Sequence, residues 1–447
     1  MKLDLRLIVP GPIGGTLLVD ADGRLPAAAI DGDEDEATVV AATAYLRDRL
    51  ALRAPILETH PRSEGVPDGE PIPTLVTTEP APDDWMPPAG FMFGRSPVSL
   101  DGVPPAILPR AMELLDELGT GAPPPELRPR WARPGWRVRA SAWMTQALAD
   151  AGRPLRDPPR PFFLRGISAL LRGSTDRGDV FLKAVFPPFH PEPVATRLLA
   201  GRFPGTVPNV IAIDADEGWL LIDDLAAPLV GELPAGQRTA GLRAGAHALV
   251  RMQRALVDDL APFLAASCPR RPLAHLGDHL DAALGPRGVA HVEGAVSDER
   301  RNRAVKATRA AVDRVTDLGF PDTIVHGDFH AGNAALVDGR VVIIDWSDAA
   351  IGNPSIDLVT WLAWSKGEPD QQQAAIDAWI DAWAGPIDPA AVRAAIADIL
   401  IVGAAYQVVS YDGIVRALEP ATRYTMAGGA SLYLERLEER LAPEVAT

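Results

Sequence analysis

The chain has 447 residues, of which 47% are hydrophobic and 23% charged. This composition is that of a folded globular protein, and the length exceeds what one hydrophobic core normally organises, so we expect more than one domain. The net charge of −16 repels nucleic-acid phosphates and anionic lipid, which disfavours a partner that is nucleic acid or a membrane surface.

Two further features bear on the compartment. Cys268 is the single cysteine, so no disulfide can form within the chain, which suits a reducing cytoplasm. The opening "MKLDLRLIVPG" has no continuous apolar core of the kind that a signal peptide needs. The later apolar stretch "ILIVGAAYQVV" is too short for a membrane span and predicts a buried helix. We therefore expect a cytoplasmic protein.

Residues 1–118 predict a small α+β accessory domain. Strand-like runs "LRLIVP" and "GTLLVD" come first, and the turn Asp20-Ala21-Asp22-Gly23 between apolar runs predicts a hairpin. Helical periodicity follows in "DEATVVAATAYLRDRLAL" and again in "AILPRAMELLDEL". The stretch "GGTLLVDADGRLP" vaguely resembles the opening of Nudix-type domains, but the metal-binding R-E-x-x-E-E run of that family is missing. The resemblance therefore implies no activity.

The rest of the chain divides by composition. Residues 119–135 are dense in proline and glycine and predict a linker. Residues 136–225 predict a helix and then a strand-rich lobe, in which "PVATRLLAGRF" is a helix with Pro193 near its start. Residues 226–447 predict a large helical lobe, interrupted by a strand hairpin at 334–345, in which we expect the catalytic loop and the substrate pocket.

The chemistry is concentrated in "IVHGDFHAGNAAL", residues 324–336. An apolar strand leads to His326, and the glycine after it permits a turn with Asp328 at its apex. The following "AALVDGRVVIID" predicts a strand, an Asp-Gly turn and a second strand, which returns Asp345 to the side of Asn333. One carboxylate is then placed to accept a proton, while a carboxylate and an amide oxygen offer the hard ligands that Mg²⁺ prefers.

The spacing H-G-D-x-x-x-x-N, followed by an apolar strand ending in I-D-W, resembles the aminoglycoside phosphotransferase-like branch of the protein-kinase-like fold. This resemblance implies an α+β, two-lobed fold with a small strand-rich lobe and a large helical lobe, preceded here by the accessory domain. It also implies that Asp328 is the catalytic base and that Asn333 and Asp345 hold magnesium. His326 and Asp357, the latter in "GNPSIDLVTWLAW", would support the catalytic loop.

The same resemblance implies a nucleotide-binding lysine. Lys183 in "VFLKAVF" lies near the end of an alternating strand, where its ammonium could reach the α- and β-phosphates. Glu192 is the only acid between Lys183 and Asp214 and is therefore the candidate partner of the lysine. Because Pro193 follows it directly, Glu192 is expected at a helix start, where pairing with the lysine is less certain.

Other nucleotide contacts are less specific. Gly166 and Gly173 flank two predicted strands without forming a G-x-G-x-x-G loop, and Ser168 could donate a hydrogen bond to phosphate. By resemblance, backbone groups near Ile222, Asp223 and Asp224 would meet the adenine edge. Main-chain contacts of this kind do not distinguish ATP from GTP, so either nucleotide is compatible.

The sequence therefore predicts an ATP- or GTP-dependent, magnesium-dependent phosphotransferase that moves the γ-phosphoryl group to a hydroxyl of a small molecule, such as an aminoglycoside, sugar or choline-type acceptor. Two alternatives are a catalytically inactive nucleotide-binding regulatory protein and a kinase acting on proteins. The second is disfavoured because no A-P-E-like segment follows Asp345. Neither the acceptor nor the oligomeric state follows from the sequence.

Overall fold

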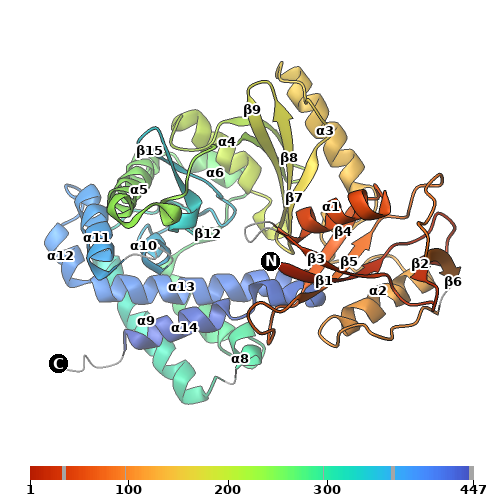
Figure 1. Ribbon diagram of the computed structural model, residues 1–447. Coiled ribbons are helices and arrows are strands. Elements are labelled where there is room, and N and C mark those ends of the chain that lie inside the picture. The colour runs from red at the N-terminus through yellow and green to blue at the C-terminus, as the bar shows by residue number, and fades with distance from the viewer. Residues whose placement is uncertain (33–36, 96, 295, 364–367, 442–447) are drawn as a thin grey trace. The chain divides into compact units, whose positions relative to one another are not determined.

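A computed structural model describes residues 1–32, 37–95, 97–294, 296–363 and 368–441 (Figure 1). The chain forms two compact units. Unit 1 contains residues 1–186 together with 418–425, and unit 2 contains residues 187–417 and the chain from 426 onwards. The sequence-based boundaries at 118, 135 and 225 stay predictions.

Unit 1 combines strands and helices. Its elements are β1 (Lys2–Ile8), β2 (Thr16–Asp20), β3 (Ala27–Asp31), α1 (Thr38–Leu50), β4 (Ile56–Pro61), β5 (Ile72–Thr78), β6 (Phe91–Arg95), α2 (Leu108–Thr120), η1 (Arg130–Ala132), α3 (Trp136–Asp150), β7 (Arg160–Leu164), β8 (Ser168–Thr175) and β9 (Gly178–Val185). Most of the short helix η6 (Pro420–Met426) also belongs to it.

A four-stranded sheet with the order β3-β1-β5-β4 organises the N-terminal part of unit 1. β1 runs parallel to β5, while β3 and β4 are antiparallel to their neighbours. Leu5 and Leu7 of β1 pack with α1 on one face, and Ile8 packs with α2 on the other. The sheet therefore lies between the two helices that the sequence predicts (Figure 1).

The predicted hairpin at residues 20–23 is wrong. The turn itself forms, since the Gly23 amide donates to the Asp20 carbonyl at 3.1 Å. The strands on either side of the turn do not pair with each other, because β2 pairs with β6 and β3 pairs with β1. A turn motif specifies the local bend of the chain, but it does not specify which strands pair with the strands on either side of the turn.

Strands β7, β8 and β9 form an antiparallel meander. The two glycines near β8 are explained by packing. A Cβ on Gly173 would lie 2.5 Å from Leu155 and 2.7 Å from Met144 of α3, and one on Gly166 would lie 3.0 Å from both Leu418 and Thr422. Close approach of neighbouring side chains therefore accounts for both positions without a phosphate.

A buried ionic network holds residues 418–425 inside unit 1. Arg110 of α2 binds Glu58 of β4 with an Nη2–Oε2 distance of 2.6 Å, and it also reaches Glu419 at 3.2 Å. Arg128 binds Glu419 at 2.8 Å, although it lies in the segment predicted as a linker. The Glu419 side chain is only 1% exposed, so this carboxylate depends on the two guanidinium groups for its charge balance.

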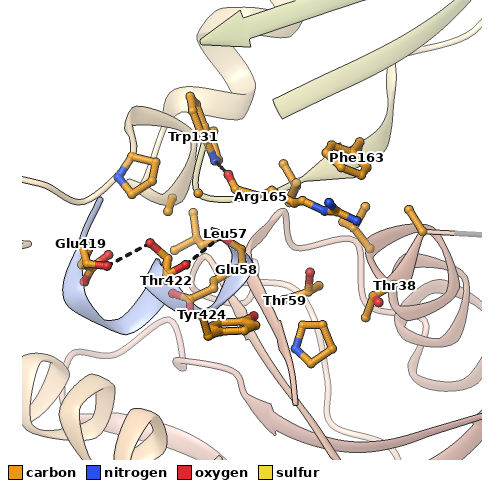
Figure 2. Close-up of a pocket in the computed structure, with 18 of the residues that line it drawn as sticks. Thr38, Leu57, Glu58, Thr59, Trp131, Phe163, Arg165, Glu419, Thr422 and Tyr424 are labelled. Carbon is orange, nitrogen blue, oxygen red and sulfur yellow. Dashed lines mark hydrogen bonds between the residues drawn. The ribbon is translucent and has the colours of Figure 1, made fainter. Parts of the chain in front are cut away.

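A cavity of about 410 Å³ lies beside this network in unit 1. Figure 2 shows Trp131, Phe163 and Tyr424 in its wall, with Glu58 and Glu419 from the network. The Trp131 indole donates to the carbonyl of Arg165 at 2.9 Å, and Thr422 donates to the carbonyl of Glu419 at 3.1 Å (Figure 2). These bonds fix the backbone on two sides of the cavity.

Unit 2 is mostly helical. Its helices are η2 (Pro187–Phe189), α4 (Glu192–Arg202), η3 (Val230–Glu232), α5 (Ala235–Leu256), α6 (Ala261–Ala265), η4 (Leu273–His275), α7 (Leu276–Ala283), α8 (Val289–Glu293), α9 (Asp298–Asp317), η5 (Ala331–Asn333), α10 (Ile356–Ala363), α11 (Pro369–Trp383), α12 (Pro389–Ala394), α13 (Ile396–Ala417) and α14 (Gly429–Glu439). Its strands are β10 (Val210–Asp214), β11 (Trp219–Asp223), β12 (Arg270–Arg271), β13 (Thr323–Val325), β14 (Ala334–Val337), β15 (Arg340–Ile343) and β16 (Ala350–Gly352).

Helix α13 is the central helix of unit 2, with α9, α10 and α14 packed around it (Figure 1). The sequence-based estimate that this apolar stretch is too short for a membrane is wrong, because the helix has 22 residues. It is the one helix among the described residues that is long and apolar enough to cross a membrane by length and composition. However, 72% of its most apolar window is buried inside the unit, as expected of a core helix.

Candidate active site

The site is built on the loop that follows β13. β13 and β16 pair antiparallel, with Val325 opposite Ala350, so the residues after Val325 leave from the end of a buried strand. Gly327 has a φ of +82°, and a Cβ there would lie 2.5 Å from the carbonyl oxygen of Asp348. Glycine is therefore required at this position by both its conformation and its neighbour.

Asp357 anchors this loop from the first turn of α10. Its two carboxylate oxygens accept from the backbone amides of His326 at 3.0 Å and Gly327 at 2.8 Å, and Gln253 of α5 donates to it at 2.8 Å. Burial raises the pKa of Asp357 to about 7, because these neutral donors only partly offset the loss of hydration. The carboxylate fixes the two amides immediately before Asp328.

His326 joins the loop to the β14–β15 hairpin. Its Nδ1 accepts from the amide of Asp328 at 3.3 Å, and its Nε2 lies 2.9 Å from the carbonyl of Ile344. These two bonds require a neutral ring that is protonated on Nε2. Burial lowers the pKa of His326, which favours the same neutral form. The ring therefore fixes the residue before Asp345 against the residue at the apex of the loop.

Asn333 and Asp345 lie at the same end of one hairpin, with Asn333 just before β14 and Asp345 just after β15. β14 and β15 pair from Ala334 and Ile343, and the Ile344 amide donates to the Asn333 carbonyl at 2.9 Å. The Asn333 side-chain amide donates from Nδ2 to the carbonyl of Asp328 at 3.0 Å, so its Oδ1 is the remaining ligand atom. Asp345 has a φ of +61°, a conformation that aspartate tolerates better than most residues.

Asp328 presents its carboxylate at the surface of unit 2, with 40% of the side chain exposed. His330 Nε2 lies 3.6 Å from its Oδ2. The backbone of Asp328 is held on both sides, by His326 through its amide and by Asn333 through its carbonyl. The loop therefore gives a fixed backbone and an accessible carboxylate, which is what a positioned base needs.

The remaining predicted residues lie elsewhere. Lys183 of β9 and Ser168 of β8 are both buried in unit 1. Glu192 is the first residue of α4, as expected from Pro193, and it is buried in unit 2. Because Lys183 and Glu192 belong to different units, their pairing stays a prediction.

The predicted hinge lies at the end of β11. Ile222 is opposite Val210 of β10, and the Asp223 amide donates to the Asn209 carbonyl at 3.2 Å. The carboxylate of Asp224 accepts from the Ala226 amide at 3.0 Å. The backbone donor of Asp223 is thus already used within unit 2, and an adenine contact by this segment stays a prediction.

Comparison with known proteins supports the interpretation of this loop. The profile of the phosphotransferase enzyme family matches residues 161–395, more than half of the chain, including the His326–Asp357 region. The chain belongs to the phosphotransferase enzyme family. No curated protein sequence matches this phosphotransferase significantly.

A solved structure supports the same fold, and a second similar chain is known. A choline/ethanolamine kinase family protein from Mesorhizobium loti is 17% identical to this phosphotransferase, covers 69% of it with 95% of its own chain, and has a TM-score of 0.50. A macrolide 2′-phosphotransferase from Brachybacterium faecium is 17% identical, covers 64% with 97% of its own chain, and has a TM-score of 0.47. The protein-kinase-like α+β fold predicted from the sequence is confirmed, and the chain is a small-molecule kinase-type phosphotransferase.

Sequence reasoning missed several residues of this phosphotransferase that support the loop. Gln253 of α5 bonds Asp357, and Gln407 of α13 donates to the carbonyl of Gly327 at 2.6 Å. Asp348 packs against Gly327, and burial raises its pKa to about 6, with Arg271 opposing the effect. Asp348 follows Asp345 by three residues, which is the one local signal that could have identified it. The two glutamines lie on distant helices and carry no motif.

Proposed function

We propose that the chain transfers the γ-phosphoryl group of ATP or GTP to a hydroxyl of a small molecule, with Asp328 as the catalytic base. The observation that carries the proposal is the loop at residues 326–328, in which the backbone on both sides of Asp328 is fixed while its carboxylate is exposed. Positioning and charge stabilisation supply most of the catalysis in phosphoryl transfer, and this loop is suited to positioning.

In the proposed reaction, the acceptor hydroxyl lies within hydrogen-bonding distance of Asp328. Its oxygen forms a bond to the γ-phosphorus while the bond from that phosphorus to the β–γ bridging oxygen breaks. The hydroxyl proton passes to Asp328, and the nucleoside diphosphate leaves with the electrons of the broken bond. Asp328 then returns the proton to solvent, since its side chain is exposed.

The donor set at the hairpin fits magnesium. Asn333 offers Oδ1 because its Nδ2 donates to the Asp328 carbonyl. Asp345 offers a carboxylate and directly follows Ile344, whose amide donates to the Asn333 carbonyl. Magnesium typically takes one or two such protein oxygens and completes its shell with phosphate and water. Asn333 and Asp345 would hold the ion, whose charge offsets that of the phosphates.

The same proposal includes the nucleotide contacts. Lys183 and Ser168 would contact phosphate, Glu192 would pair with Lys183, and the backbone of residues 222–224 would contact adenine. The burial of Lys183 and Glu192 supports it, because a buried charge is costly unless it is paired. A cytoplasmic location is also proposed.

The test is Asp328→Asn, which removes the base and keeps the shape of the side chain. We expect the rate of nucleoside diphosphate release with a hydroxylated acceptor to fall on the order of 10²–10⁴-fold. The matched control is Asp338→Asn in the exposed turn between β14 and β15, where asparagine suits the left-handed backbone equally well. Equal turnover in the two variants would overturn the role of Asp328.

The same assay separates the inactive alternative. A nucleotide-binding regulatory protein would bind magnesium–ATP in calorimetry, with unaltered affinity in Asp328→Asn, and would release no diphosphate with any acceptor. Acceptor-dependent release by the native chain would exclude that alternative.

A further inference from the structure

A cavity of about 580 Å³ lies within unit 2, in the size range of pockets for drug-sized ligands. Its walls come from α7, from the central helix α13, and from the segment around β12 that precedes α7. Residues of η2 and the loop after Asp345 complete the lining. The resemblance places a substrate pocket among helices at roughly residues 235–320 of the large lobe, which include α7, but it names no acceptor for it.

The cavity borders the loop that carries Asp328. Asp348, which lines the cavity, packs directly against Gly327. Tyr406 also lines it, and the next residue of α13, Gln407, bonds the carbonyl of Gly327. The negative charge of Asp328 contributes to the raised pKa of Asp348, after the larger effect of burial. The wall of the cavity therefore contacts the residue directly before Asp328.

The carboxylates that line the cavity are paired with arginines of the same lining, which also contains His279. Among the described residues that line it, the carboxylates are those of Asp348 and Asp412. Asp348 lies 3.7 Å from Nη2 of Arg271 and accepts from Ser410 at 3.4 Å. Asp412 lies 2.8 Å from Nε of Arg416 and accepts from the amide of Val289 at 2.9 Å. Each acid thus has a guanidinium partner within the lining.

The remaining lining is suited to an apolar body with a polar edge. The side chains of Phe189, Leu273, Leu276, Val409 and Ile414 supply apolar wall. The polar edge is formed by Asp348, the hydroxyl of Ser410 and the Tyr406–Arg271 pair, in which Arg271 donates to the phenol oxygen. Hydroxyl groups can both donate to and accept from such an edge.

We infer that this cavity is the acceptor site and that it takes a hydroxylated molecule with an apolar body and no positive charge. This inference rests on the proposed function, which supplies the phosphoryl transfer, and it adds the class of acceptor. A cationic acceptor would lose hydration on entering and would find both lining carboxylates already paired with arginines. Acceptors with several amino groups are therefore excluded by the lining, although the whole chain carries a charge of −16.

Arg271 is then the residue that sets specificity, because it neutralises Asp348 at the edge nearest to Asp328. Arg271→Gln removes one of the two arginine charges from the lining and should therefore weaken the exclusion of cations from the cavity. Arg270→Gln is the matched control, since Arg270 is the preceding residue, is exposed, and is not part of the lining. Arg416→Gln provides a second, independent test, because this half-exposed arginine neutralises Asp412.

The experiment uses matched probe series on the full chain: phenyl glucoside, its 2-amino derivative and its uronic acid, with the corresponding cyclohexyl series. Binding is ranked by thermal shift and calorimetry, which need no turnover, and diphosphate release is measured in parallel. We expect the neutral or acidic members to bind at least about tenfold more tightly than the amino members. We expect this preference to shrink about tenfold or reverse in Arg271→Gln and in Arg416→Gln, but not in Arg270→Gln.

Tighter binding of the amino members by the native chain would overturn the inference, as would the absence of any binder in all series. An unchanged preference in both Arg271→Gln and Arg416→Gln would also overturn it. The proposed function fails separately, if bound neutral members yield no diphosphate or if Asp328→Asn retains native turnover. Binding and release therefore distinguish the two claims.

Discussion

Unit 1 and unit 2 each bury carboxylates, and the two units balance them in different ways. In unit 1, burial opposes the ionisation of Glu58, but hydrogen bonds from His60 and Arg110 outweigh it and lower the pKa of Glu58 to about 2. In unit 2, Asp357 is equally enclosed but receives only neutral donors, and burial raises its pKa to about 7. A cationic partner, rather than depth of burial, decides which form the folded chain prefers.

The buried carboxylates of the two units also differ in what they hold in place. The network of Glu58, Arg110, Glu419 and Arg128 joins distant segments of the chain. Glu419 lies 309 residues after Arg110 and 291 residues after Arg128. It therefore fixes tertiary structure. Asp357 instead fixes two successive backbone amides beside Asp328, which determines the geometry of the proposed base.

The largest loss of stability is expected when the charge pairing of the buried arginines in unit 1 is removed. Glu419→Gln leaves two buried arginines without their shared charge partner, and we expect the free energy of unfolding to fall by about 3–5 kcal/mol. Glu113→Gln is the control, since this acid also binds Arg110 but is 45% exposed and should cost less than about 1 kcal/mol. Denaturant unfolding measures both. Equal losses would show that burial adds nothing to the network.

An intermediate effect on stability, with a larger effect on turnover, is expected in unit 2. Asp357→Asn places an NH₂ group against one of the two backbone amides, and an unsatisfied buried donor costs about 1–3 kcal/mol. Displacement of the loop should lower turnover by roughly 10²-fold.

The control for that substitution is Asp388→Asn, because Asp388 accepts from the Ala390 amide at the exposed start of α12 and asparagine caps helices equally well. Stability is followed by denaturant unfolding and turnover by diphosphate release. Native turnover in Asp357→Asn would show that the loop is positioned without this carboxylate.

The smallest effect is in the pH dependence of the free energy of unfolding. As the pH rises, Glu58 should increase this free energy and Asp357 should decrease it. The folded pKa of Glu58 lies below its ordinary value of 4.5, so its contribution is present above about pH 4.5 and is lost as the pH falls toward 2. The folded pKa of Asp357 lies above its ordinary value of 3.8, so stability is lost as the pH rises from about 3.8 to 7. Each group changes the free energy of unfolding by at most about 1.4 kcal/mol per pH unit.

Hydrogen exchange of peptides from each unit measures how the stability of that unit changes with pH. The native chain is compared with Glu58→Gln for unit 1 and with Asp357→Asn for unit 2. Parallel slopes in the two units would contradict the comparison, because they would mean that Arg110 and His60 do not alter the titration of Glu58.

Much of the site follows from local sequence, because its parts are close in the chain. Residues 324–345 contain a strand, a glycine turn and an Asp-Gly hairpin, and each of these forms as the pattern predicts. The phosphotransferase family and the kinase-like fold were predictable for the same reason. The metal and base roles of Asp328, Asn333 and Asp345 stay predictions.

The contacts that could not be predicted join residues that are far apart in the sequence. Gln253 and Gln407 reach the loop from α5 and α13, across 104 residues to Asp357 and 80 residues to Gly327. A glutamine on a helix has no pattern that distinguishes a buried partner from an exposed side chain. The pairing of β2 with β6 was missed for a similar reason, since a turn signal specifies a bend and not the neighbour of a strand.

The segment 418–425 has a practical consequence for anyone who trims this chain. It follows directly after α13, whose last turns line the inferred acceptor cavity, and its Glu419 is neutralised by Arg110 and Arg128. Removal of residues 1–118 would therefore discard Arg110 and leave a buried acid short of counter-charge. The N-terminal region is thus better regarded as a built-in part of the enzyme than as a detachable tag, and shortened versions should be expected to lose solubility before they lose the catalytic loop.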